Sequence, residues 1–205
     1  MTAMTSTSGT ENPGDQPTGT SAPDASEATP EWAPVEPLPS SEMFVAAFAG
    51  LDRVAARDIL DPAADLADCH RECRLAFEVL SDPSASAEEM KSAAAELVSA
   101  KADLDMLIMV IDDAVAERLR QRHEDRHFDT PPTSPADAVA EVAVHTESIG
   151  EIAAKMADLW ERAVSKGADP MTTATSEAHE LAVLCAGYDC LAAEIESDRR
   201  TLPGM

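Results

Sequence analysis

The sequence predicts an all-α protein, an up-and-down bundle of four to five helices that follows a disordered N-terminal tail. Three observations predict this. The first 39 residues are rich in Pro, Ser and Thr and contain no Lys or Arg; apolar residues recur at helical spacing from Ser40 onward; and aromatic residues make up only 3% of the chain. A core of Ala, Leu, Val, Ile and Met favours closely spaced helices over a sheet. We therefore divide the chain into a tail, residues 1–39, and a helical bundle domain, residues 40–202.

The tail has too little apolar surface to offset the conformational entropy of ordering it, so it is expected to be disordered. Its last part differs, because Trp32, Val35 and Leu38 recur every third residue among prolines. On an extended polyproline-like strand this spacing forms one apolar edge. Two interpretations remain open: a short docking motif for another protein, or a linker that packs its own Trp32 against the bundle.

Two helices are expected between Ser40 and Pro83. Ser40 or Ser41 caps the first, which reaches about Leu60. Asp61-Pro62 then supplies an N-cap followed by proline at the first helical position, and the second helix ends at Ser81-Asp82-Pro83 or continues with a kink. The apolar faces are Phe44, Phe48, Leu51, Ala55 and Ile59 in the first helix, and Leu66, Cys69, Cys73, Ala76, Phe77 and Leu80 in the second.

One long helix is expected over about 86–127. Ser86 and Glu89 form a capping box at its start. The apolar positions alternate steps of four and three residues, which is a heptad seam interrupted once by Lys101. Such a helix spans roughly 60 Å at the standard rise per residue. The seam consists of Met90, Ala94, Leu97, Lys101, Leu104, Ile108, Ile111 and Val115.

Two further helices follow the Pro131-Pro132 turn. The fourth starts near Pro135 and ends at Gly167, with Val139, Val142, Thr146, Ile149, Ala153, Met156, Trp160 and Ala163 on its apolar face. Asp169-Pro170 repeats the cap-plus-proline signal, and the last helix presents Ala178, Leu181, Cys185, Tyr188, Ala192 and Ile195. No segment alternates as a strand does, and Leu202-Pro203-Gly204 is expected to be a frayed end.

The charge disfavours several classes of partner. The formal net charge is −24, and the tail contributes six acidic residues and no basic ones. Such a charge repels nucleic-acid phosphates and anionic lipid, so we expect neither direct nucleic-acid binding nor membrane binding. A basic protein partner would be attracted. Acidic mimicry of nucleic acid would use a face of the long helix that includes Asp103, Asp105, Asp112, Asp113 and Glu117.

The N-terminal residues lack the basic region and the apolar run of an export signal, and the apolar segment Leu107–Ile111 is too short to cross a bilayer. Without an export signal, the four cysteines are better interpreted as reduced thiols than as a disulfide framework. A cytoplasmic location is therefore expected.

The sharpest literal motif is His123-Glu124-Asp125-Arg126-His127, which fits H-E-x-x-H. In zinc proteases the two histidines hold the metal and the glutamate activates its water. Here the flanks are basic, prolines end the helix at once, and no third ligand stands at a fixed spacing, although Glu141, His145 and Glu147 follow. A basic helix C-terminus that complements the helix dipole is the preferred interpretation.

The cysteines form no standard metal motif. Cys69 and Cys73 share one helical face, and Cys185 and Cys190 lie on the last helix, but the CxxxC and CxxxxC spacings match no zinc knuckle. Cys69, Cys73 and Cys185 fall on apolar seams, where cysteine acts as a small core residue. Cys190 lies off the seam and is the expected reactive thiol.

No glycine-rich phosphate loop and no catalytic arrangement of Ser, His and carboxylate residues is apparent in the sequence, so no catalytic, cofactor-binding or metal-binding residue is predicted. We expect a non-enzymatic interaction or assembly protein that binds a protein partner, or itself, through apolar helix seams. The alternatives are an acidic inhibitor that mimics nucleic acid on a basic protein, and a metal-binding protein that uses His123 and His127 or the cysteines.

Overall fold

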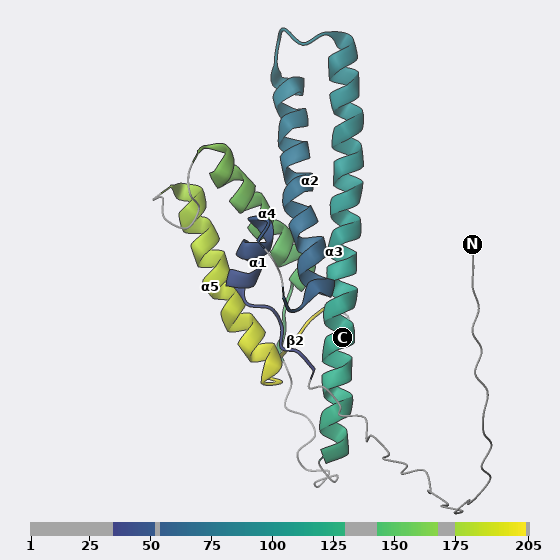
Figure 1. The fold of residues 1–205 in the computed structure, drawn as a ribbon, viewed down its shortest axis with the longest axis vertical. Coiled ribbons are helices and arrows are strands. Elements are labelled where there is room, and N and C mark those ends of the chain that lie inside the picture. Colours follow the sequence, from purple (N-terminus) through teal and green to yellow (C-terminus); the bar gives the residue numbers. More distant parts are fainter. Residues whose placement is uncertain (1–34, 52–53, 130–142, 168–174, 204–205) are drawn as a thin grey trace, which may run out of the picture. The chain divides into compact units, whose positions relative to one another are not determined.

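The computed structural model describes residues 35–51, 54–129, 143–167 and 175–203, and for residues 125–129 it describes the backbone alone. Five helices account for most of the described residues, which confirms the predicted all-α bundle. α2 and α3 form an antiparallel hairpin, α4 packs against both of them, and α5 packs against α4 and α1 (Figure 1). The predicted tail lies outside the described residues except for residues 35–39.

α1 (Ser41–Phe48) begins at Ser40, whose hydroxyl accepts a hydrogen bond from the Met43 N–H. The prediction that this helix reaches Leu60 was wrong. Gly50 has a φ of +70°, and its N–H and that of Leu51 donate to the carbonyls of Ala47 and Ala46. This pair of bonds is a Schellman motif, which ends a helix at a glycine.

α2 (Arg57–Ser81) starts before the predicted cap, and Pro62 lies inside it. Ala56 occupies the cap position in the left-handed conformation, and its N–H donates to the Glu36 carboxylate at 2.9 Å. Asp58, in the first turn, is ion-paired with Arg118 of α3, which lowers the pKa of Asp58. Contacts with distant residues therefore set this helix start.

α3 (Ala87–Asp129) is the predicted long helix, and Ser86 and Glu89 form the predicted capping box. The seam that packs on α2 differs in its first half. Lys101 is exposed and lies over the Phe77 ring at 5.9 Å, while small alanines one position earlier are buried instead. The buried positions of α3 are Ala93, Ala100, Leu107, Ile111, Val115 and Arg118.

α4 (Ile149–Ser165) starts later than predicted, at a capping box formed by Ser148 and Glu151, and Gly167 ends it as expected. Residues 135–142 of the predicted helix lie outside the described residues. α5 (Ser176–Glu196) is capped by Thr175 rather than by Asp169, which is also outside them. The helices pack around one core that includes Phe44, Ile59, Leu66, Ile111, Ile149, Met156, Leu181 and Tyr188.

Two short strands were not predicted. β1 (Ala143–Val144) pairs in parallel with β2 (Arg200–Thr201). Leu202, predicted to fray, is buried and belongs to the core cluster. The strand pair therefore holds the segment after α5 against the bundle.

Candidate functional site

The structure describes two of the three residues of the predicted docking edge, and one of these two is buried. Trp32 lies outside the described residues, Val35 is half-buried, and Leu38 is buried. The Leu38 N–H donates to Glu196 at 2.7 Å, and the Tyr188 hydroxyl donates to the Pro39 carbonyl at 2.7 Å. Leu38 therefore packs within its own chain and is not available to a partner, whereas Trp32, whose packing the linker interpretation expects, lies outside the described residues.

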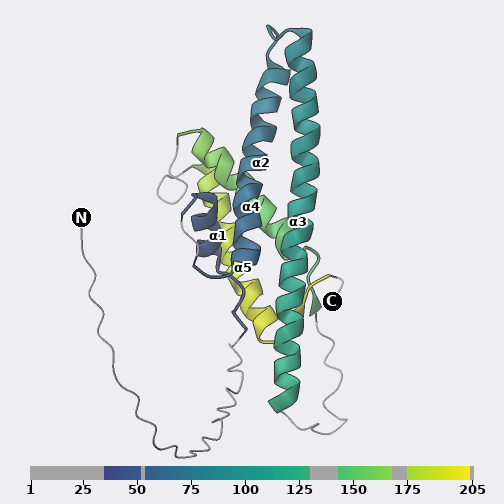
Figure 2. The same ribbon diagram turned by 45° about the vertical axis from the view of Figure 1, so that its right-hand side comes forward.

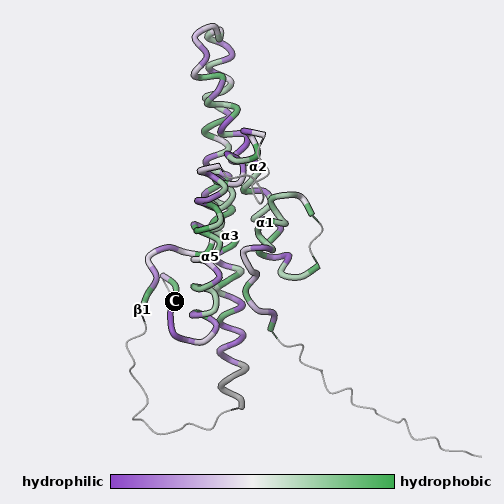
Figure 3. The backbone as a smooth tube through the Cα atoms, turned by 90° about the vertical axis from the view of Figure 1, so that its left-hand side faces the viewer, coloured by the Kyte–Doolittle hydropathy of each residue, from purple (hydrophilic) through white to green (hydrophobic). Residues whose placement is uncertain are grey.

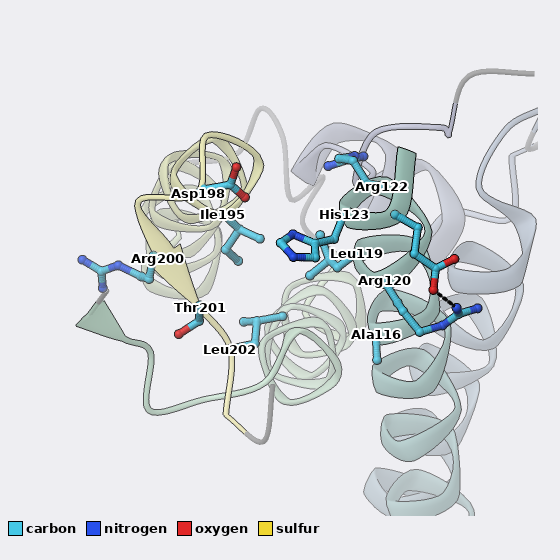
Figure 4. Close-up of a pocket in the computed structure, with 11 residues that line it drawn as sticks. Ala116, Leu119, Arg120, Arg122, His123, Ile195, Asp198, Arg200, Thr201 and Leu202 are labelled. Atoms are coloured by element: carbon cyan, nitrogen blue, oxygen red, sulfur yellow. Dashed lines mark hydrogen bonds and ion pairs between the residues drawn. The ribbon is translucent and has the colours of Figure 1, made fainter. Parts of the chain in front are cut away.

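The H-E-x-x-H segment lies in the last described turns of α3. The side chain of His127 lies outside the described residues. Glu124 is ion-paired with Arg120, which Figure 4 labels, so the Glu124 carboxylate faces a guanidinium of the same helix. Among the side chains that the structure describes, no group of three or more His, Cys, Asp or Glu residues converges to hold a metal ion.

A cavity of about 520 Å³ lies beside this segment, between α3 and the end of α5 with β2. His123 points into it toward Ile195, and Leu119 and Leu202 also line it (Figure 4). Its basic residues are matched by carboxylates of the same chain: Arg120 by Glu117 at 2.6 Å, Arg122 by Glu196 at 3.3 Å, and Arg200 by Glu194 at 2.7 Å. The cavity therefore offers little uncompensated positive charge to an anionic ligand.

The four cysteines do not form one cluster. Cys69 and Cys73 are buried on α2, whereas Cys185 and Cys190 lie on α5, which packs against α1 and α4 rather than α2. Burial raises the pKa of Cys69 to about 11, with Glu72 adding to the shift. Burial also raises the pKa of Cys73 and of Cys185. These three thiols are therefore poor nucleophiles at neutral pH.

The junction of α2 and α4 contains a charged cluster that the sequence did not reveal. Glu161 is only 5% exposed, and it accepts a hydrogen bond from Arg74 at 3.1 Å while Arg71 lies 3.5 Å away. One turn earlier on each helix, the His70 ring lies 3.8 Å from Asp158. This cluster joins two helices and has the features of a structural ion pair. Only knowledge that α2 crosses α4 here could have identified it.

The five acidic residues proposed for mimicry do not share one face of α3. At about 100° per residue, Asp103 and Asp105 lie roughly 160° apart around the helix. Asp112 accepts the Gly150 N–H at 2.7 Å, and Glu117 is paired with Arg120. Two of the five carboxylates are therefore engaged within the chain.

The exposed apolar residues are concentrated on the α2–α3 hairpin. Of thirteen large apolar side chains that are exposed in the described residues, eight lie on these two helices. The closed end of the hairpin extends beyond α1, α4 and α5 (Figures 1 and 2), and hydrophobic and hydrophilic positions alternate around its turns (Figure 3). The eight residues are Leu75, Phe77, Val79, Met90, Val98, Met106, Met109 and Val110.

Comparison of the chain with family models, with curated proteins and with solved structures gives no match. Within the described residues, none of the helices has both the length and the apolar character that spanning a bilayer requires.

Proposed function

We propose that this protein is a non-enzymatic interaction or assembly protein, which recognises a protein partner through the exposed faces of the α2–α3 hairpin. The observation that carries the proposal is the concentration of exposed large apolar residues on these two helices. Scattered surface apolar residues are normal, whereas a concentration of large ones on one part of the surface is typical of a protein-binding surface.

The geometry of the hairpin suits such a role. Beyond its crossing with α4, the hairpin buries mainly alanines, Ala76, Ala93 and Ala100, so its larger apolar side chains remain outside. Val98 is 70% exposed and Phe77 is 50% exposed, and they lie on different helices. An amphipathic partner helix can pack against such a surface by inserting its own side chains between the exposed apolar side chains.

Site-specific photo-crosslinking in the cells that naturally contain the protein tests the proposal. A benzophenone side chain replaces Phe77 or Val98 in the full chain, one position at a time. We expect discrete crosslinked protein products from at least one of these positions. Val183, which is 60% exposed on α5, is the matched control and should give none. The proposal fails if neither hairpin position crosslinks to any protein, or if all three positions give the same products.

A further inference from the structure

α3 has a second apolar stripe on the side that faces away from α2. At about 100° per residue, the stripe centres on Ala102, roughly 160° around the helix from Ala100, which packs on α2. Val98 is 70% exposed and Met109 is 60% exposed, so no other described segment covers the stripe. Its members are Ala95, Val98, Ala102, Met106, Met109 and Val110. Their spacing approximates the heptad pattern by which one helix packs along another.

Charged pairs flank the two ends of this stripe in the same order. Glu88 and Lys91 lie before it, 3.9 Å apart, and Glu117 and Arg120 lie after it, 2.6 Å apart. In both pairs the acid precedes the base by three residues. These four side chains are exposed on α3.

The order of the charges along α3 favours one orientation of a partner helix on the stripe. In a parallel copy of α3, Glu88 would meet Glu88 and Arg120 would meet Arg120, which is repulsive. In an antiparallel copy, Glu88 comes level with Arg120 and Lys91 comes level with Glu117. Both charge matches then form twice because of the twofold symmetry, and the apolar stripes of the two copies overlap between them. Asp103 comes level with Asp105 of the other copy in the same register, a repulsive match on the flanks of the stripe that the two attractive matches outnumber.

We infer that the outer face of α3 binds a second copy of this chain, with the two α3 helices antiparallel and Glu88 of each copy level with Arg120 of the other. This inference rests on the proposed function, since it names the partner of one face of the hairpin. The charge pairs set the orientation and register, whereas the apolar stripe provides most of the stabilisation.

Charge exchange tests the orientation directly, with the dissociation constant of the dimer measured by sedimentation equilibrium on the full chain. Glu88→Arg places like charges against Arg120 of the other copy, and Arg120→Glu does the same against Glu88. Each single substitution should raise the dissociation constant about tenfold, since it replaces two attractive contacts with two repulsive ones. The double variant Glu88→Arg/Arg120→Glu should return to within about threefold of the unmodified protein.

Recovery in the double variant can arise only between copies. Residues 88 and 120 lie about 48 Å apart along one α3, so they cannot contact each other within a chain. The intrachain costs of the two changes, including loss of the Arg120 pairs with Glu117 and Glu124, should add rather than cancel. Circular dichroism verifies that each variant keeps its helices. If the double variant is as weak as the sum of the singles, this register is wrong.

A second pair of variants tests the apolar stripe. Val98→Asp should raise the dissociation constant more than tenfold, whereas Val183→Asp, at a similarly exposed valine of α5, should leave it unchanged. A chain that stays monomeric at all accessible concentrations overturns the inference. If the benzophenone at position 98 then crosslinks only a different protein, the proposed function stands and self-association alone fails. If no hairpin position crosslinks any protein, the proposed function fails as well.

Discussion

Glu161 and His70 lie where α2 crosses α4, and both are largely removed from water. The two groups differ in the partners that their polar atoms have. Glu161 accepts a hydrogen bond from Arg74, and this bond raises the pKa of Arg74. The His70 ring lies 3.8 Å from Asp158, and burial lowers the pKa of His70 although Asp158, the Ala154 backbone and Glu161 act to raise it. The neutral imidazole is therefore favoured in the folded chain.

This lowered pKa predicts how stability depends on pH. His70 has an ordinary pKa of 6.5 when unfolded and a lower one when folded, so its contribution is complete above pH 6.5 and is lost as the pH falls below it. His70→Asn should therefore flatten the free energy of unfolding between pH 7.5 and 5.5. The change in slope is bounded by one proton, about 1.4 kcal/mol per pH unit. Urea unfolding followed by circular dichroism at several pH values measures it.

Asp158→Asn provides the opposite test. Removing this carboxylate deletes the group that raises the pKa of His70, so the folded protein should resist protonation more strongly and lose more stability on acidification. If both variants keep the slope of the unmodified protein, His70 is not the group that titrates. The carboxylate of Asp58, whose pKa Arg118 lowers, acts in a lower pH range and is unchanged in both variants.

At the scale of the helix, α4 approaches the α3 backbone closely at Gly150. A Cβ built on Gly150 would overlap the Ile108 carbonyl oxygen, which belongs to the α3 backbone and cannot move independently. Gly150→Ala should therefore destabilise the fold by about 1–3 kcal/mol, because the start of α4 must shift away from α3. Thermal or urea unfolding of the purified variant measures this loss.

Gly187 is the matched control, since it is also helical but has nothing within 4 Å of the position that an alanine methyl group would occupy. Gly187→Ala should stabilise the protein by about 0.5–1 kcal/mol, through the ordinary preference of a helix interior for alanine. Equal effects of the two substitutions would contradict the close approach of α4 to α3.

The helices show which features local sequence determines. The long helix was predicted well because Ser86 and Glu89 cap it through their own side chains, within three residues. The start of α2 was not, because its cap depends on Glu36, twenty residues earlier in the chain. In the first half of α3, the predicted seam is one residue away from the residues that pack on α2. Ala93 and Ala100 are buried there because small side chains permit close helix packing, but their low hydrophobicity gives no signal in the sequence.

The candidate site, too, could be predicted only in the features that local sequence determines. The sequence predicted the long helix but assigned a single apolar seam to it. Placing α2 against α3 gives the helix a packed face, with Ala100 and Leu107, and an outer face, with Val98 and Met109, and none of these four residues belonged to the predicted seam. The β1–β2 pairing joins residues 143–144 to residues 200–201, and no local pattern in two-residue strands could have predicted it.

At the scale of the whole chain, several of the 15 basic residues join one helix to another. Arg118 joins α3 to Asp58 of α2, Arg74 joins α2 to Glu161 of α4, and Lys166 joins the end of α4 to Glu177 of α5. Acidic residues outnumber the basic residues that could pair with them, so most of the net charge of −24 lies on the surface. The inferred contact between copies must offset this charge, and the outer face of α3 offers apolar side chains together with the two charge matches.

The same arrangement predicts a gradient of local stability along the hairpin. Near α4 and α5, α3 buries Leu107, Ile111 and Val115, whereas near its start it buries Ala93 and Ala100. Less apolar area is removed from water at the closed end, so local opening should require less free energy there. Hydrogen exchange at low protein concentration should therefore be faster for amides of residues 88–100 than for those of residues 104–116.

Raising the protein concentration should change this profile selectively. An antiparallel partner covers residues 88–120 of the outer face of α3, so exchange of residues 88–100, which open most easily, should slow most, whereas α5 should exchange as before. The Val98→Asp variant should keep the initial gradient but lose its concentration dependence. Uniform protection along α3 at low concentration would contradict the gradient. A concentration dependence that persists in Val98→Asp would instead place the contact between copies on another surface.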